Sequence, residues 1–337
     1  MRPADLLIPR PEGLYCPPGD FFIDPVRPVA RALVTHAHSD HATRGHGAVL
    51  ATRETLDIMA IRLGDAFAGT TQATSYGEAI PMDGVTVTFH PAGHVLGSAQ
   101  VEVAAPALRI VAAGDYKRTS DATCTAFQPI PCDVFITEAT FALPVFRYPP
   151  PAQEIAKLLH SLAQFQDRTH LVGCYALGKA QRLIALLRQA GYDAPIFLHG
   201  ALRRLCDYYV AEGIPLGELS DATLSRGRAR DFAGQIVLGP PSAFEGAWIR
   251  RFTDPLIAFA SGWMQVRARA RQRGVELPLI ISDHCDWPEL ISTIAELDPS
   301  QTWVTHGREE ALVRWCTLQG RTARPLHLVG YEDEAED

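Results

Sequence analysis

The segment with the clearest chemical potential is Thr35-His36-Ala37-His38-Ser39-Asp40-His41, which directly follows a short apolar run. Four metal-ligand side chains fall within six positions, 36–41. In an extended segment His36 and His38 share one face, and a turn in the following loop would direct Asp40 and His41 to a neighbouring point. Imidazole nitrogens and carboxylate oxygens are the ligands that borderline divalent metals prefer. The spacing therefore predicts a binuclear metal site rather than a solvated polar loop.

Two further candidate ligands, His94 and Asp115, follow predicted strands. Taken alone, a loop histidine is more often structural and such an aspartate more often forms a turn. Together with the first segment they gain weight. We expect one metal to be held by His36, His38 and His94, a second by Asp40 and His41, and Asp115 to bridge both. Because two carboxylates offset only part of the charge of two divalent ions, the site should attract hydroxide and an anionic substrate.

The elements that must position these residues change in character along the chain. From Arg31 to Ala139 short β-type runs outnumber helices, and the exception is Arg53 to Leu63, which has apolar residues at helical spacing. The strands predicted here are 31–35, 48–52, 85–90, 99–104, 108–113 and 133–138. After Pro149-Pro150-Pro151 the pattern alternates, with helices at Gln153 to Ala163 and Lys179 to Ala190 and strands at His170 to Cys174 and Pro195 to His199. Such alternation is typical of βαβ units.

A third part of the chain begins near Pro278. Its pattern predicts a buried strand at Leu279 to Ser282, a helix at Pro288 to Leu297 and a strand at Thr302 to Thr305. The chain should then end in a helix, a strand and a solvated acidic tail.

The composition narrows the class of protein. The chain has 337 residues, of which 47% are hydrophobic and 20% charged, as in a globular protein. No apolar run approaches the ~18 to 20 residues that cross a bilayer, and the first residues lack the apolar core of a secretory signal. Seven cysteines without a CxxC pair argue against a zinc ribbon or a disulfide framework. We therefore expect a soluble, cytoplasmic protein with no membrane segment.

The pattern His36-x-His38-x-Asp40-His41, with His94 and the step Gly114-Asp115, resembles the signature of the metallo-β-lactamase fold. The resemblance implies an α/β protein with an αββα sandwich and metals at strand ends. That signature is shared by hydrolases of lactams, thioesters and phosphodiesters, so it does not define the substrate.

Three later segments resemble motifs A, B and C of the β-CASP nuclease branch of this fold. They are Thr137-Glu138-Ala139-Thr140, Ser282-Asp283-His284-Cys285-Asp286 and Val304-Thr305-His306-Gly307, each expected to close a strand. The resemblance implies an inserted β-CASP α/β cap domain. The expected divisions are 1–147 and 278–330 for the metallo-β-lactamase domain, 148–277 for the cap and 331–337 for the tail.

The resemblance also implies roles for single residues. His306 would complete the second metal's ligands, while His284 would contact the phosphate or protonate the leaving oxygen, oriented by Glu138. Asp40 would serve catalysis as well as metal binding. Asp24, in Phe22-Ile23-Asp24-Pro25, and Asp286 would orient metal ligands without binding a metal themselves. The implied reaction is two-metal phosphodiester hydrolysis, with Zn²⁺ favoured and Mn²⁺ as the alternative.

The predicted cap carries a local positive charge suited to phosphate backbones. Residues 225–275 hold nine arginines against three acids. The arginines are 226, 228, 230, 250, 251, 267, 269, 271 and 273. For the last four, whose spacing spreads them around a helix, a solvated helix face is an equal alternative. Further predicted phosphate contacts are Lys179, Ser261 and Gly262. Lys179 follows a sequence like a P-loop, but Ala180 stands where the magnesium-binding Ser or Thr belongs, which excludes ATP binding there.

The likeness of the whole chain is greatest to bacterial ligase-associated DNA exonucleases, which implies single-stranded or frayed DNA ends as substrate. It also implies a link in DNA repair to an ATP-dependent DNA ligase and a helicase. His306 at motif C, however, resembles RNA-processing members, so a ribonuclease is the alternative. A small-molecule thioester or lactone hydrolase would need the same metals but not Glu138, His284 or the arginines. A scaffold without catalysis is disfavoured because all the expected ligands are present.

Overall fold

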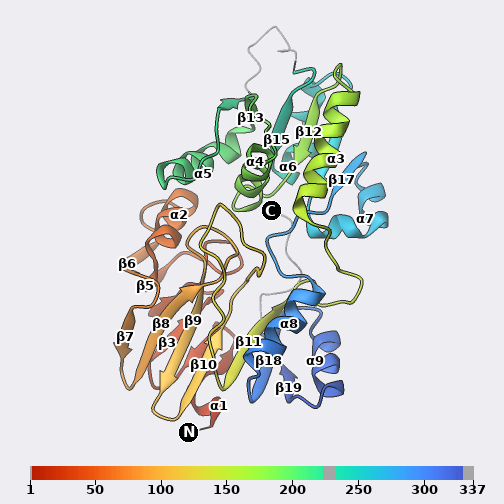
Figure 1. The fold of residues 1–337 in the computed structure, drawn as a ribbon. Helices are drawn as coiled ribbons and strands as arrows, with labels where there is room; N and C mark the ends of the chain where they lie inside the picture. Colours follow the sequence, from red (N-terminus) through yellow and green to blue (C-terminus); the bar gives the residue numbers. More distant parts are fainter. Residues whose placement is uncertain (1, 223–231, 329–337) are drawn as a thin grey trace. The chain divides into compact units, whose positions relative to one another are not determined.

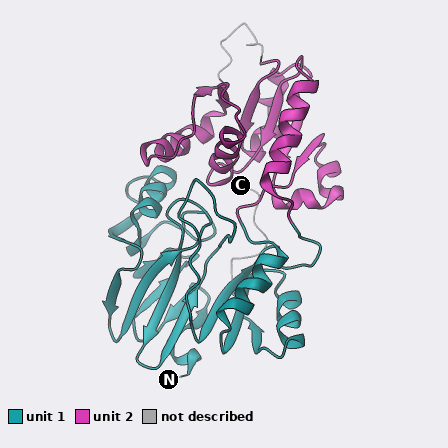
Figure 2. Ribbon diagram, in the orientation of Figure 1, with its two compact units in different colours: residues 1–147, 284–335 teal, residues 148–283, 336–337 magenta. Residues whose placement is uncertain are grey.

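The computed structural model describes residues 2–222 and 232–328, which form two compact units (Figure 1, Figure 2). The first unit comprises residues 1–147 and resumes at residue 284, and the second comprises residues 148–283. The second unit is therefore an insertion in the first. The predicted phosphate contacts at arginines 226, 228 and 230 and the acidic tail lie outside the described residues.

The first unit contains two mixed sheets. One runs in the order β1 (Ile8–Arg10), β2 (Gly13–Cys16), β3 (Phe21–Ile23), β4 (Arg31–Leu33), β5 (His46–Thr52) and β6 (Ala68–Thr74). The other runs in the order β19 (Ala323–Pro325), β18 (Gln301–Gly307), β11 (Val134–Ala139), β10 (Leu108–Ala112), β9 (Ala99–Ala105), β8 (Val85–Pro91) and β7 (Ala79–Met82). The alternation of β8 buries Val85, Val87 and Phe89, the period of two expected of a strand with one face in a core.

Two hydrophobic cores organise this unit into layers. One lies between the sheets and joins, for example, Phe21 and Leu33 to Val87 and Val101. The other joins the opposite face of the second sheet to α8 (Trp287–Leu297) and α9 (Glu309–Leu318). On the first sheet, α2 (Arg53–Leu63) packs against β5 and β6, and the short α1 (Pro3–Leu6) adds Leu6 to the core between the sheets. The layers are helix, sheet, sheet and helix, which confirms the predicted αββα sandwich.

The second unit is built on a wholly parallel sheet. Its strand order is β14 (Leu219–Asp221), β13 (Ile196–Leu198), β15 (Ile236–Gly239), β12 (His170–Gly173), β16 (Leu256–Ala260) and β17 (Leu277–Leu279). The helices are α3 (Pro151–Gln164), α4 (Lys179–Gln189), α5 (Gly200–Ala211), α6 (Pro241–Glu245) and α7 (Arg267–Gln272), with 3-10 turns η1 (Ile249–Arg251) and η2 (Gly262–Gln265). Its strands β12, β13 and β15 are buried throughout, as expected when helices cover both faces.

The strand predicted at Leu279 to Ser282 is wrong. The strand is β17, Leu277–Leu279, which pairs with β16 and belongs to the sheet of the second unit. Its parallel partner, rather than local apolar content, determines where it ends. The segment Ser282 to Asp286 accordingly closes no strand, and His284 lies in the loop before α8. Among the described residues, no helix combines the length and apolar character needed to cross a bilayer.

Candidate metal centre

The predicted metal ligands of the first unit follow the ends of several strands. His36 and His38 come after β4, His94 after β8 and Asp115 after β10. The chain turns tightly after His38, whose carbonyl accepts hydrogen bonds from the amides of His41 (3.2 Å) and Ala42 (2.8 Å). That turn brings the side chains of Asp40 and His41 back toward the strand end, as the sequence pattern requires.

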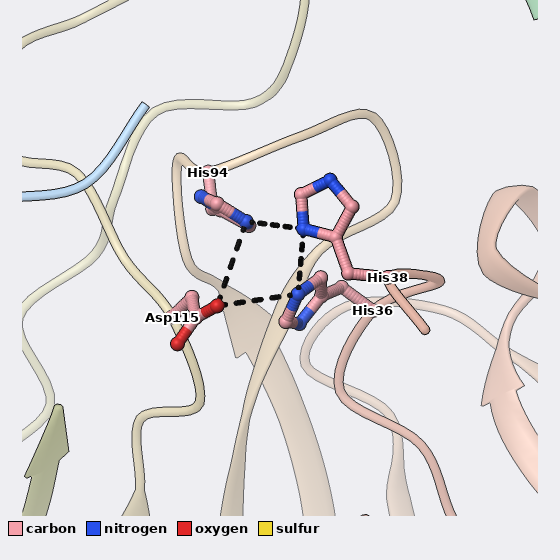
Figure 3. Close-up of side chains that lie close together, drawn as sticks. All are labelled: His36, His38, His94 and Asp115. Carbon is pink, nitrogen blue, oxygen red and sulfur yellow. Dashed lines mark hydrogen bonds and ion pairs between the residues drawn. The ribbon is translucent and has the colours of Figure 1, made fainter. Parts of the chain in front are cut away.

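Four of these side chains converge on one point (Figure 3). His38 Nδ1 lies 3.1 Å from His36 Nε2 and 3.0 Å from His94 Nε2. Asp115 Oδ2 lies 3.4 Å from His36 Nε2 and 3.8 Å from His94 Nε2. His36 and His94 are almost completely buried. Three ring nitrogens and a carboxylate oxygen thus face one small volume.

A second group adjoins the first. Single ligand atoms of Asp40, His41 and His306 lie within 4.8 Å of one another. The rings of His41 and His306 stack with centroids 4.8 Å apart. Asp115 Oδ2 is 3.4 Å from His41 Nε2, the same distance as from His36 Nε2 in the first group. Asp115 Oδ2 is therefore close to both groups, as its predicted bridging role requires.

His306 owes its position to an irregularity between β11 and β18. Thr137 pairs with Val304 but Ala139 pairs with Gly307, so β18 contains one extra residue at this point. Such bulges redirect side chains, often beside active sites. His306 has a φ of 56°, in the left-handed region, and a Cβ on Gly307 would lie 2.5 Å from the carbonyl oxygen of Ala139. The bulge requires glycine at 307 and directs His306 toward His41.

Burial and the close approach of histidines and carboxylates shift the pKa values of the two groups. Burial, followed by the charge of His41, lowers the pKa of His36, so its ring is neutral and offers a lone pair. Burial opposes ionisation of Asp40, but His41 and its neighbours lower its pKa to about 2. Burial raises the pKa of Asp115 to about 6. Asp115 Oδ1 is buried without a hydrogen-bond partner among the described residues, which a bound cation would satisfy.

This donor set fits two divalent ions. Five imidazoles and two carboxylates are arranged in two groups, and such His/Asp clusters are typical of a binuclear metallo-β-lactamase site. The residues of the two groups are His36, His38, His94 and Asp115, and Asp40, His41 and His306.

Asp24 holds His41 from behind. Its Oδ2 lies 2.7 Å from His41 Nδ1, while its Oδ1 accepts from the amide of Thr35 at 2.7 Å. When Nδ1 donates its proton to Asp24, Nε2 is left as the ligand atom. Thr35 also lies close to the loop that carries Asp115, since a Cβ on Gly114, at a φ of 58°, would lie 2.8 Å from Thr35 Oγ1. Glycine permits this close approach of the two ligand loops.

Glu138 and His284 form a buried pair beside the metal groups. Glu138 Oε2 lies 2.9 Å from His284 Nδ1, and its Oε1 accepts from the amide of Tyr116 at 2.9 Å. Glu138 is fully buried and His284 is 3% exposed. Ligand atoms of Asp115, Glu138 and His284 lie within 4.8 Å of one another. The pair fixes the ring of His284 and leaves Nε2 as the atom through which it would act.

The His284 loop is held by two residues that were not predicted from the sequence, Lys117 and Glu289. Lys117 Nζ donates to the carbonyl of His284 (3.2 Å) and to Glu289 Oε2 (3.0 Å). Glu289 also accepts from the amide of Thr119 at 2.9 Å. Asp286, predicted to support a ligand, accepts from the amide of Glu289 at 3.0 Å and caps α8. The pattern Asp-x-x-Glu is a capping signature that could have pointed to Glu289, but no sequence signal marks Lys117.

The other predicted substrate contacts belong to the second unit. Lys179 begins α4, is 2% exposed and forms an ion pair with Asp283. Ser261 accepts from the amide of Trp263 at 3.3 Å and so caps η2, which begins at the buried Gly262. Each of the three therefore has a local structural role.

Comparison with known proteins adds to this picture. No protein-family model matches the chain. It is 29% identical over 325 residues to a probable DNA ligase of Opitutus terrae, covering 90% of this chain and 30% of that protein. It is 27% identical over 256 residues to the endoribonuclease ysh1 of Emericella nidulans, covering 73% of this chain and 27% of that one. A solved protein of unknown function from Enterococcus faecalis has a similar fold, with a TM-score of 0.57 at 14% identity over 82% of this chain and 75% of that chain.

The chain is homologous to these curated proteins, and its fold and its two His/Asp groups are what a metallo-β-lactamase fold with a β-CASP insert implies. The chain spans less than a third of the length of the two curated relatives.

Proposed function

We propose that the chain is a metal-dependent phosphodiester hydrolase that degrades DNA from its ends. The observation that carries the proposal is the buried Glu138–His284 pair beside Asp115. A thioester or lactone hydrolase needs only the metals to activate water. Expulsion of a sugar oxygen from phosphorus benefits from a proton donor, and a histidine held by a carboxylate is a suitable one.

The proposed ligands of one ion are His36, His38 and His94, and those of the other are Asp40, His41 and His306, with Asp115 between them. The excess of imidazole favours Zn²⁺, while the carboxylates also suit Mn²⁺. When bound, such ions lower the pKa of water and stabilise charge that develops on phosphate oxygens. Asp24 keeps His41 in the tautomer that ligation requires, because it accepts the proton of Nδ1.

The proposed role of His284 is to donate the proton of Nε2 to the leaving oxygen as the phosphorus–oxygen bond breaks. Glu138 accepts a hydrogen bond from Nδ1 of His284, so Nε2 is the nitrogen that faces the leaving oxygen as proton donor. The carboxylate also stabilises the protonated ring. Lys117, through the His284 carbonyl, is a positioning residue for the same loop.

DNA is the favoured substrate because nearly the whole chain matches a protein named a probable DNA ligase. An exonuclease linked to such a ligase, and to a helicase in repair, would act in the cytoplasm on single-stranded or frayed ends. A second candidate is RNA. It is favoured by His306 at motif C and by the match to endoribonucleases. Ser261 and Gly262 remain predicted phosphate contacts. Lys179 could serve only if its ion pair with Asp283 opened.

End-labelled single-stranded DNA and RNA of matched sequence, incubated with the protein and Zn²⁺ or Mn²⁺, test the proposal. Stepwise shortening of DNA from one end, absent in Asp115→Ala, is the expected result, and the labelled end gives the polarity. Cleavage of RNA with DNA spared would favour the second candidate. Hydrolysis of thioesters or lactones with neither nucleic acid cleaved would overturn the proposal.

A further inference from the structure

A groove on the second unit combines arginines with aromatic side chains. It has a volume of about 690 Å³, and its lining includes Phe244, Ile257 and Phe259 together with Arg269, Gln272 and Arg273. The two arginines are exposed, whereas Phe259 is only 5% exposed. We name this feature the arginine groove. All of its lining residues belong to the second unit, residues 148–283. The metal ligands belong to the first unit.

Helical geometry divides the four arginines of α7 and its C-terminal cap into two pairs. At 100° per residue, Arg269 and Arg273 share one side of the helix, and Arg267 and Arg271 share the opposite side. Only the first pair lines the groove. Ala270 is 5% exposed and joins the cluster around Phe259, which attaches the helix to the unit. The four arginines are thus not equivalent, although all four are exposed.

The groove arginines are held by aromatic rings. The guanidinium carbon of Arg269 lies 3.9 Å from the centroid of the Trp263 ring, and that of Arg273 lies 5.2 Å from the centroid of Phe259. A guanidinium that stacks on a ring can still donate from its edge to a phosphate. Because stacking already restricts these side chains, less conformational entropy is lost when they bind an anion.

The surrounding charge fits a polyanion. Residues 241–275 contain six arginines and no lysine, against the two acids Glu245 and Asp254. Glu245 also lines the groove and reduces its positive field. Phe244 lines the groove and is half-buried, so part of its side chain is accessible for stacking with an unpaired base. Arginines beside aromatic rings are the combination that binds single strands rather than duplexes.

We propose that the arginine groove binds the phosphate backbone of single-stranded nucleic acid through Arg269 and Arg273. The inference rests on the proposed function for its choice of ligand. The groove holds a strand and takes no part in the reaction. A short diester can therefore react at the metal centre without binding to the groove. Loss of two phosphate contacts should reduce the slope of log K against log salt by about 1.4, which is about 25-fold in affinity at 0.1 M salt.

The test compares two double variants of the full chain. Arg269→Ala/Arg273→Ala removes the groove pair, and Arg267→Ala/Arg271→Ala removes the same charge from the opposite side of α7. Binding of fluorescent 30-mer oligothymidylate and oligouridylate is followed by anisotropy in EDTA, where neither strand is cleaved. We expect the groove variant to lose about 25-fold in affinity for both strands and the control variant to lose much less. Glu245→Gln should bind more tightly than the wild type.

Equal losses of affinity in the two double variants would overturn the proposed binding site. They would show that the arginines act only through a non-specific positive field. Competition by polyglutamate as effective as by oligothymidylate would overturn the site too, since any polyanion would then suffice. Arg269→Lys/Arg273→Lys, which keeps the charge, should retain the salt slope but bind less tightly than the wild type, and this checks that folding is intact. Hydrolysis of bis(p-nitrophenyl) phosphate by the metal-loaded protein tests the chemistry separately. Hydrolysis of this diester without binding of either strand would refute the groove and spare the proposed reaction.

Discussion

The ion pair between Lys117 and Glu289 provides a quantitative test of how the His284 loop is held. The side chain of Lys117 is 7% exposed and that of Glu289 is 18% exposed. Removing one partner of a buried pair costs ~3–5 kcal/mol, because the other charge is left uncompensated. Since Glu289 keeps its hydrogen bond from the Thr119 amide, we predict the lower end of that range for Lys117→Met, about 3 kcal/mol.

A double-mutant cycle isolates the pair. Lys117→Met, Glu289→Gln and the double variant are unfolded with urea and followed by circular dichroism, in EDTA so that bound metal adds nothing. The double variant should be about 2 kcal/mol more stable than the sum of the single effects predicts. The control is Arg118→Met, which removes the neighbouring, more exposed pair with Glu296 and should cost less than about 1 kcal/mol. If the effects of the two single variants sum to the effect of the double variant within about 0.5 kcal/mol, the ion pair does not hold the loop as described.

The same pair predicts a dependence on pH. Burial raises the pKa of Glu289, but Lys117 and the hydrogen bonds from Thr119 outweigh it and hold the pKa below the ordinary value of 4.5. The folded state therefore favours the carboxylate, so its stabilisation is complete above pH 4.5 and is lost as the pH falls through the lower, folded value. The stability difference between wild type and Glu289→Gln should shrink in that range. A difference that grew on acidification would contradict this assignment.

Two more substitutions test the buried carboxylates of the first unit. Glu138→Ala should lower the free energy of unfolding by about 2–6 kcal/mol, because it leaves the amide of Tyr116 and Nδ1 of His284 without their acceptor, while Glu138→Gln, measured by the same urea titration, should lose less. Asp24→Asn should weaken metal binding by about 10- to 100-fold in competition with a chromogenic chelator, since the amide cannot accept from both Thr35 and His41; unchanged affinity would show that Asp24 does not orient His41.

The sequence predicted those parts of the fold whose signals are local. The helix at Arg53 to Leu63 has apolar residues at helical spacing and coincides with α2. The alternation before His94 gave the correct strand β8, Val85–Pro91, to within a residue. The ligand pattern at 36–41 could be interpreted because its residues are neighbours in the chain, and the turn after His38 brings them together.

Features that depend on distant partners could not be predicted in this way. The strand at 277–279 ends where its pairing with β16 ends, which an apolar run cannot reveal. The bulge that directs His306 arises from the register between β11 and β18. Lys117 contacts Glu289 across a long stretch of sequence, and neither residue type suggests a buried ion pair.

The most direct test of the central claim compares His284→Ala with the wild type, measuring both metal content and the rate of degradation of end-labelled single-stranded DNA. The proposal predicts that the variant retains two divalent ions per chain and that its rate falls by about 10²- to 10⁴-fold. A variant that loses its metals would make His284 a ligand instead, and one that retains the wild-type rate would show that the Glu138–His284 pair takes no part in the reaction.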